Sequence, residues 1–285
     1  SVRASLSELI RRQAPRAAIM LACLLAYGGT LKTSEMFHDD QLIIGDNILL
    51  RHGWRSVPEL FTTGYWEAAH GAAASVHEYR PLLMLSFWAQ FNATGPAPGP
   101  MHGANVALHM AACLLLFEVL KRRLGPTAAM AGALAFAVFP IHTEAVSSLT
   151  GRSELMAAAF LLASWLCLGG APPPKRAAAG AALFFASLLT KEHSLLLPAF
   201  LALSDWTFEG KAPWHPDRRA IYGALTACCC AYLAIRVSVL SSAFHAGIPY
   251  FHGVGLLKKL LTIARFDVVH YVSPGITGLG LCTDY

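Results

Sequence analysis

The hydrophobic residues of this 285-residue chain are gathered into long apolar blocks separated by polar connections. A helix needs about 20 mainly apolar residues to cross a hydrocarbon core about 30 Å thick. The blocks lie at residues 15–31, 102–120, 127–141, 154–170, 177–190, 194–206, 219–236 and 256–273. Several are short for a span, and 177–190 and 194–206 are the weakest pair. The pattern predicts an all-α polytopic membrane protein with about eight spans.

The longest connection, residues 32–101, contains apolar segments that are too short to cross a bilayer. Residues 81–91 are predicted to form an interfacial or re-entrant helix. Residues 47–66 have the apolar spacing of a short amphipathic helix lying in the interface. The proline- and glycine-rich stretch 95–100 predicts a turn, and the sequon at Asn92 is compatible with glycosylation or with none. The aromatic residues expected to anchor this region at the interface are Trp54, Tyr65, Trp66 and Trp88.

Composition supports a membrane protein, because 55% of the residues are hydrophobic and only 14% are charged, against about 25% charged in soluble domains. Six of the seven cysteines fall inside apolar blocks, and no C-x-x-C pair occurs. They are predicted to be small buried apolar residues, not a disulfide framework or a zinc site. The sequence therefore predicts neither a metal nor another cofactor.

The basic residues indicate how the spans are oriented, because cytoplasmic connections of membrane proteins collect Lys and Arg. With the N-terminus inside, every second connection carries a basic cluster. We interpret these clusters as orientation signals, so the net charge of +5 does not indicate a nucleic-acid partner. They are Arg11, Arg12 and Arg16; Lys121, Arg122 and Arg123; Lys175 and Arg176; and Lys211, Arg218 and Arg219.

The remaining connections, 32–101, 142–153, 191–194 and 237–255, are assigned to the outer face, in an organelle lumen or a periplasm. Acidic residues lie in or beside these connections: Asp39, Asp40, Asp46, Glu67, Glu78, Glu144, Glu154 and Glu192. Asp39 and Asp40 follow the first span closely. A carboxylate there can act as a general base toward a hydroxyl, although a helix cap or a solvated loop also explains the pair.

Four cations on the outer face are candidate ligands for a phosphate: Arg80, Arg152, Lys191 and Arg236. For Arg80, snorkelling to lipid headgroups is an equal alternative, and Lys191 has the alternative of pairing with Glu192. His142, Glu144 and Glu154 accompany Arg152 in one short connection, where a hydrogen-bonded network is the simpler explanation. Two ligands at i, i+2 are too few to indicate a metal site.

Together these groups suit an acidic lipid-linked substrate whose tail lies in the bilayer and whose phosphate lies at the interface. No G-x-x-x-x-G-K, G-x-S-x-G or dinucleotide-binding glycine pattern occurs. The sequence thus gives no support for soluble nucleotide chemistry.

The chain resembles the TMTC family, the transmembrane and tetratricopeptide-repeat proteins that O-mannosylate cadherins, in the order of its motifs. These motifs are FHDD…DN, LFTTGYW, HEYRPLLMLSF, HGANVALH, FPIHTEAVSSLTGRSELMAA, LLTKEHSLLLP and SPGITGLGLCTDY. The resemblance runs from about residue 30 to the end. HTEAV…GRSELMAA and YRPL…SF are its most specific parts.

The resemblance implies a GT-C fold with interfacial helices in the first lumenal loop, and a catalytic base at Asp39 or Asp40. It implies transfer of mannose from dolichyl-phosphate-mannose to a Ser or Thr hydroxyl of a cadherin-like domain, without a metal. It places the protein in the endoplasmic reticulum membrane with a lumenal site, or in a bacterial inner membrane if the source is prokaryotic.

The chain departs from the family in two ways. It shows no tetratricopeptide repeat, so a truncated transmembrane domain is expected. Residues 241–251 lack the acidic DNP sequence that is frequent in the family. The acceptor or donor contacts that the resemblance implies for this loop are therefore not expected to carry over unchanged. The alternatives are a non-catalytic membrane adaptor on the same fold and a transporter. The clustering of charges at span ends disfavours the transporter.

Overall fold

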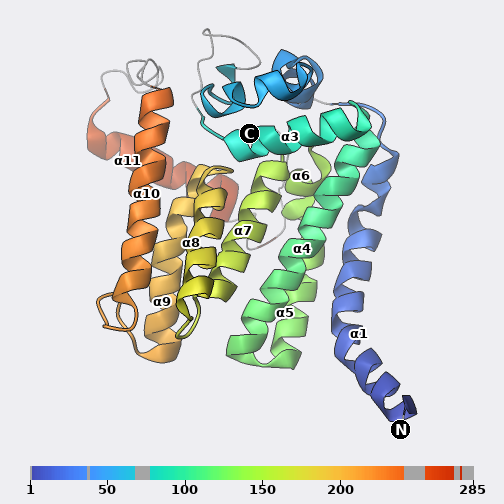
Figure 1. The fold of residues 1–285 in the computed structure, drawn as a ribbon, viewed down its shortest axis with the longest axis vertical. Coiled ribbons are helices and arrows are strands. Elements are labelled where there is room, and N and C mark those ends of the chain that lie inside the picture. The colour runs from blue at the N-terminus through green and yellow to red at the C-terminus, as the bar shows by residue number, and fades with distance from the viewer. Residues whose placement is uncertain (1, 37–38, 68–77, 241–253, 273–276, 278–285) are drawn as a thin grey trace.

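The computed structural model describes residues 2–36, 39–67, 78–240, 254–272 and 277, and every regular element in these ranges is helical (Figure 1). Long helices lie side by side and form a bundle, with shorter helices at one end. The bundle helices are α1 (Val2–Tyr27), α4 (Pro98–Leu124), α5 (Pro126–Val138), α7 (Arg152–Leu168), α8 (Pro174–Leu188), α9 (Leu197–Glu209) and α10 (Arg219–Val239). The all-α prediction is confirmed for the described residues.

Three of the described helices are long and apolar enough to cross a membrane: Gln13–Lys32, Pro98–Leu124 and Arg219–Val239. Each of the other predicted blocks also contains a helix. These helices are shorter, from the 12 residues of α11 (Leu256–Asp267) to the 17 residues of α7. A π-helical segment, Val268–Val272, continues α11. The blocks are thus placed correctly as helices, and the number of spans stays a prediction.

Proline and glycine set several helix boundaries. Proline lies in the first turn of α3 (Pro81–Thr94), α4, α5, α8 and α9, where no intrahelical N–H bond is lost. Gly125 has a φ of 83° and separates α4 from α5, so the chain reverses directly at Pro126. Gly210 ends α9 in the left-handed conformation, which an L side chain adopts only at a cost.

Residues 39–67 do not form the single amphipathic helix predicted for 47–66. The chain instead makes three short 3₁₀ turns, Ile48–Leu50, Gly53–Ser56 and Glu59–Phe61. Gly53, with a φ of 62°, and Pro58 interrupt a regular helix. The apolar side chains of this lobe still share one side, because Leu50 and Leu60 pack in one core with Phe87 of α3.

Two of the four predicted aromatic anchors are enclosed by the protein. Trp54 is 81% exposed, whereas Tyr65 and Trp88 are buried. The indole N–H of Trp88 donates to the Gly53 carbonyl at 2.9 Å, and that of Trp66 donates to Glu78 at 3.1 Å. The expectation of an interfacial anchor is therefore wrong for Tyr65 and Trp88, which the protein encloses, and it stays a prediction for Trp54 and the half-buried Trp66.

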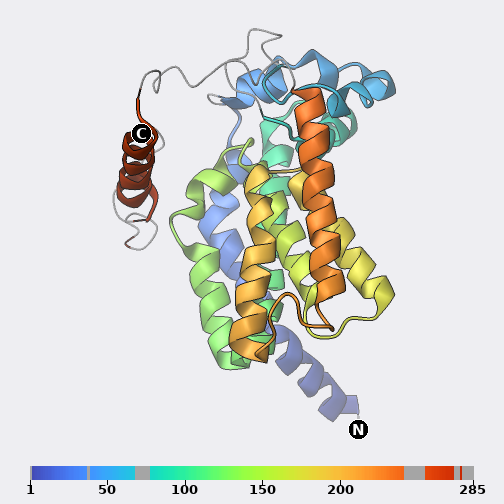
Figure 2. The same cartoon turned by 90° about the vertical axis from the view of Figure 1, so that its left-hand side faces the viewer.

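The two ends of the bundle differ in their polar residues. Figures 1 and 2 show α3 and the 39–67 lobe at one end, and the α4–α5, α7–α8 and α9–α10 connections at the other. The described basic clusters lie on or beside this second end. Arg123 there pairs with Glu209 at 3.0 Å, and Arg218 pairs with Asp205. The arrangement agrees with the alternation predicted from the basic residues.

Candidate active site

Asp39 and Asp40 have different environments although they are adjacent. Asp40 is 4% exposed, and its carboxylate accepts hydrogen bonds from the backbone N–H of Thr150 at 2.9 Å and of Leu149 at 3.1 Å. The Ser148 hydroxyl donates to it at 3.3 Å. Asp39 is exposed and has no hydrogen bond or ion pair within the described part of the chain. Asp40 therefore fixes this segment to the connection between α6 (His142–Ser147) and α7, while the Asp39 carboxylate is open to solvent.

Tyr65 connects the aspartate pair to a second charged group. Its phenol is buried, and burial raises its pKa, with the negative charges of Glu78, Asp39 and Asp40 acting in the same direction. The guanidinium of Arg80 lies 5.1 Å from the centre of the Tyr65 ring. Both aspartates and Arg80 are thus within electrostatic range of the Tyr65 phenol. The sequence alone indicated only an interfacial aromatic residue at this position.

Arg80 is the centre of an ion-pair network. It contacts Glu78 at 2.8 Å and Glu192 at 3.2 Å, and Arg236 reaches the other oxygen of Glu192 at 3.6 Å. Burial raises the pKa of Glu78, and the charge of Arg80 opposes this rise. The structure therefore brings together Arg80, Glu192 and Arg236, which are far apart in the sequence.

Lys191 and Glu154 form a neighbouring ion pair between the connection that follows α8 and the first turn of α7. His193 Nδ1 lies 3.6 Å from the second oxygen of Glu154. Burial lowers the pKa of His193, and the charge of Glu154 opposes this. The predicted pairing of Lys191 with Glu192 is replaced by the pair with Glu154, while Glu192 pairs with the two arginines.

Arg152 differs from the other cations because its bonding partners are neutral. Its side chain is buried and donates to the Asn105 side chain at 3.0 Å, the Gln90 side chain at 2.6 Å and the Met101 carbonyl at 3.2 Å. The guanidinium also lies 4.5 Å from the centre of the Phe87 ring. No carboxylate within the described ranges comes within 4 Å of it.

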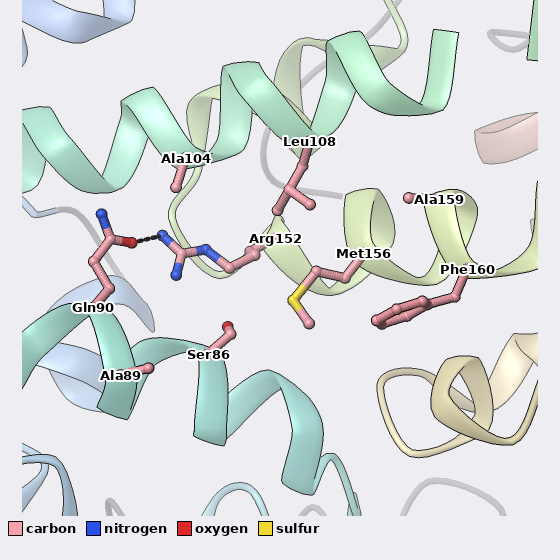
Figure 3. Close-up of a pocket in the computed structure, with 9 residues that line it drawn as sticks. All are labelled: Ser86, Ala89, Gln90, Ala104, Leu108, Arg152, Met156, Ala159 and Phe160. Carbon is pink, nitrogen blue, oxygen red and sulfur yellow. Dashed lines mark hydrogen bonds between the residues drawn. The ribbon is translucent and has the colours of Figure 1, made fainter. Parts of the chain in front are cut away.

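A pocket of ≈ 450 Å³ opens beside Arg152 between α3, α4 and α7. Figure 3 shows the guanidinium at one end, next to Gln90 and Ser86, with the apolar side chains of Leu108, Met156 and Phe160 leading away from it. The pocket therefore combines one cation with an apolar wall. It is lined by Ser86, Ala89, Gln90, Ala104, Leu108, Arg152, Met156, Ala159 and Phe160.

His142 and Glu144 lie outside this network. The ring of His142 packs against Phe136 at 4.2 Å and against His109 at 5.5 Å between centres. Its pKa is lowered to about 4 by burial and by the neighbouring His109. Glu144 is exposed. The structure gives His142 an aromatic environment and places Glu144 at the surface.

His102 is a buried polar residue for which the sequence predicted no role. It is 2% exposed, and neither ring nitrogen has a hydrogen-bond partner among the described residues. The one feature of the sequence that pointed to His102 is its place at the start of the motif HGANVALH. The structure puts this motif in the first half of α4.

Several known proteins are similar in sequence to this chain. No protein-family model and no solved structure matches the chain. Protein O-mannosyl-transferase TMTC1 of Homo sapiens is 33% identical over 161 residues, which is 53% of this chain and 18% of that protein. Protein O-mannosyl-transferase TMTC3 of Mus musculus is 31% identical over 149 residues, covering 52% and 16%. Protein O-mannosyl-transferase Tmtc1 of Drosophila melanogaster is 35% identical over 144 residues, covering 49% and 16%.

These matches thus cover about half of this chain and less than a fifth of the length of each relative. The relatives are named as enzymes, and all three carry the same family name. The resemblance to the TMTC proteins that the motifs indicated is confirmed by these relatives.

Proposed function

We propose that this chain carries the membrane-embedded site of a protein O-mannosyltransferase. In this proposal it moves mannose from dolichyl-phosphate-mannose to a Ser or Thr hydroxyl of a lumenal, cadherin-like domain in the endoplasmic reticulum. The names of the relatives support mannosyl transfer to protein. The lipid donor and the cadherin acceptor come from the family resemblance.

The observation that carries the proposal is the position of Arg152 at the end of an apolar pocket. A buried cation without a carboxylate partner favours an anion, and a planar guanidinium suits a phosphate. The apolar lining suits the isoprenoid chain next to that phosphate. We therefore assign the donor phosphate to Arg152 and the beginning of its lipid chain to the pocket.

Asp39 is our candidate for the general base, because it is exposed while Asp40 is occupied by backbone N–H groups. Asp40 is bonded to Leu149 and Thr150, only two to three residues before Arg152. It therefore links the segment that carries the base to the start of the helix that carries the phosphate ligand. Arg80, Lys191 and Arg236 stay candidate phosphate ligands, but an anion must first displace their carboxylate partners.

The proposed reaction is an inverting displacement. Asp39 takes the proton of the acceptor hydroxyl, whose oxygen attacks the anomeric carbon of mannose. The bond from that carbon to the phosphate oxygen breaks, and the lipid phosphate leaves with the electron pair. Arg152 stabilises the charge that develops on the phosphate.

The test uses the full chain in membranes with dolichyl-phosphate-mannose and a purified cadherin domain. Asp39→Asn is expected to lower mannose transfer at least ~100-fold, as for loss of a general base, while donor binding is retained. Arg152→Lys keeps the charge but loses the planar fork. It is expected to weaken binding of a photoreactive polyprenyl-phosphate probe.

The matched control is Asp46→Asn, because Asp46 is an exposed carboxylate of the same lobe that hydrogen-bonds the Gln41 side chain. Full transfer by Asp39→Asn would overturn the assignment of the base. Unchanged labelling of Arg152→Lys would overturn the phosphate site. Absence of transfer by the unchanged chain would favour the non-catalytic adaptor.

A further inference from the structure

Three potential metal ligands meet inside the bundle, away from the proposed active site. Cys23 of α1 and His109 and Cys113 of α4 are each at most 1% exposed. Their ligand atoms all lie within 4.8 Å of one another. His109 and Cys113 are four residues apart, so they lie on the same face of α4. The sequence could not show this group, because Cys23 is at least 86 positions away from the other two residues.

Two of the three separations match those around a tetrahedral zinc ion, and the third, between Cys23 Sγ and the His109 ring, is within 4.8 Å. Zn–S bonds of about 2.3 Å and Zn–N bonds of about 2.0–2.1 Å at tetrahedral angles place two sulfurs ~3.8 Å apart, and a sulfur and a nitrogen ~3.6 Å apart. The observed distance from Cys23 Sγ to Cys113 Sγ is 3.8 Å. The distance from Cys113 Sγ to His109 Nε2 is 3.6 Å.

We propose that Cys23, His109 and Cys113 bind a zinc ion that joins α1 to α4. Two thiolates and a neutral imidazole around Zn²⁺ have no net charge. This matters because the site lies in an apolar cluster that contains Ile19, Phe117 and Ala133. A singly charged copper ion with the same two thiolates would leave a net negative charge there, which burial disfavours.

Binding requires defined proton movements. The two thiol protons are released to solvent as the sulfurs bind the ion. His109 Nε2 lies 3.0 Å from the Ala137 carbonyl oxygen, and in one ring tautomer it donates to that oxygen. For Nε2 to bind zinc, the ring proton must be on Nδ1, and the Ala137 oxygen, 3.0 Å from Nε2, is a candidate for the fourth ligand.

Such a site would fix the helix that leads to the proposed base. α1 continues through the 3₁₀ turn Gly28–Lys32 toward Asp39. Part of the apolar surface of α1, including Leu21 and Leu25, is exposed and does not pack against the rest of the protein. Because binding free energy in a structural zinc site is also folding free energy, the ion would hold α1 in register against α4.

The full chain is purified in detergent without added metal, and its zinc and copper contents are measured by mass spectrometry. We expect near one zinc ion per chain in the unchanged protein. Replacing zinc by Co²⁺ should give a thiolate-to-cobalt charge-transfer band. A strong chelator should lower the melting temperature. Cys23→Ala and Cys113→Ala should each lose the ion and the charge-transfer band, and the chelator should then have no effect.

Cys228→Ala is the matched control, because Cys228 is a half-buried thiol of α10 that contacts the Ala181 carbonyl instead of a histidine. It should keep the zinc. If the unchanged chain holds copper, holds no metal even after reconstitution with Zn²⁺, or has Cys23 and Cys113 joined as a disulfide, the proposal is overturned. These measurements on the unchanged chain decide the question even if an alanine variant fails to fold.

Discussion

At the scale of single residues, the two aspartates show why neighbours in a sequence need not share a function. Asp40 accepts three hydrogen bonds from the connection before α7, and Asp39 is exposed. The doublet itself predicted a charged site, but not which carboxylate is enclosed. That depends on residues 148–150, more than 100 positions away.

Asp40→Asn is therefore predicted to destabilise the fold. An amide supplies one acceptor oxygen and adds a donor where two backbone N–H groups need acceptors. Hydrogen bonds to charged groups contribute about 1.5–3 kcal/mol, so we expect a loss of about 2–3 kcal/mol in the free energy of unfolding. Chemical denaturation in detergent, followed by circular dichroism, measures it. The exposed Asp46→Asn should change the free energy by less than about 0.5 kcal/mol. Equal stability of the two variants would contradict the structural assignment of Asp40.

The same limit applies to the rest of the candidate site. The sequence identified Arg80, Lys191 and Arg236 as cations of one face, and the structure places them in neighbouring ion pairs. The sequence did not identify the neutral hydrogen-bond partners of Arg152. Gln90 and Asn105 belong to α3 and α4, and only the packing of those helices against α7 brings them to the guanidinium.

At the scale of elements, apolar blocks predicted the helices well, because a helix that satisfies its own backbone is the main solution for a long apolar segment. The 39–67 lobe was predicted less well. Gly53 and Pro58 were visible in the sequence, but the three turns are arranged by the side chains that pack against α3. Local periodicity does not contain that information.

Asp205 and Arg218 connect three elements at the basic end of the bundle. Both side chains are fully buried, and Arg218 Nε donates to Asp205 at 2.6 Å. Arg218 also donates to the carbonyls of Leu168 and Gly170 at 2.8 and 2.7 Å, so α9, α10 and the end of α7 meet at one guanidinium. From the sequence, Arg218 was interpreted only as a positive charge on the cytoplasmic side, so its role in joining the helices was not predicted.

Asp205→Ala is predicted to lower the free energy of unfolding by about 3–5 kcal/mol, because it leaves a buried guanidinium without its counter-charge. The double variant Asp205→Leu with Arg218→Met removes both charges and should recover much of this loss. Asp217→Asn is the control, since the side chain of Asp217 is 54% exposed and its pair with Lys211 should contribute less than about 1 kcal/mol. Chemical denaturation of the three variants compares them. A double variant less stable than Asp205→Ala would show that the pair is not the source of the effect.

At the scale of the whole molecule, the proposed chemistry depends on which side of the membrane each end of the bundle faces. The 39–67 lobe and the α9–α10 connection lie at opposite ends of the bundle (Figure 1). The lobe contains Trp54 and the connection contains Trp214, and each of these side chains is 81% exposed. The basic residues near Trp214 favour a cytoplasmic location for that end of the bundle, because connections rich in Lys and Arg are retained on the cytoplasmic side.

Single cysteines introduced as Trp54→Cys and Trp214→Cys test this orientation in sealed microsomes whose cytoplasmic face is outward. A membrane-impermeant thiol reagent should label Trp214→Cys in intact vesicles, and Trp54→Cys only after the membrane is permeabilised. The unchanged chain gives the background from its own cysteines, and equal reactivity of both variants in detergent shows that each site is accessible. The reverse pattern would place Asp39 in the cytoplasm, where a lumenal acceptor domain cannot reach it. The geometry around Arg152 would then need a different substrate, because the base and the acceptor hydroxyl must share one compartment.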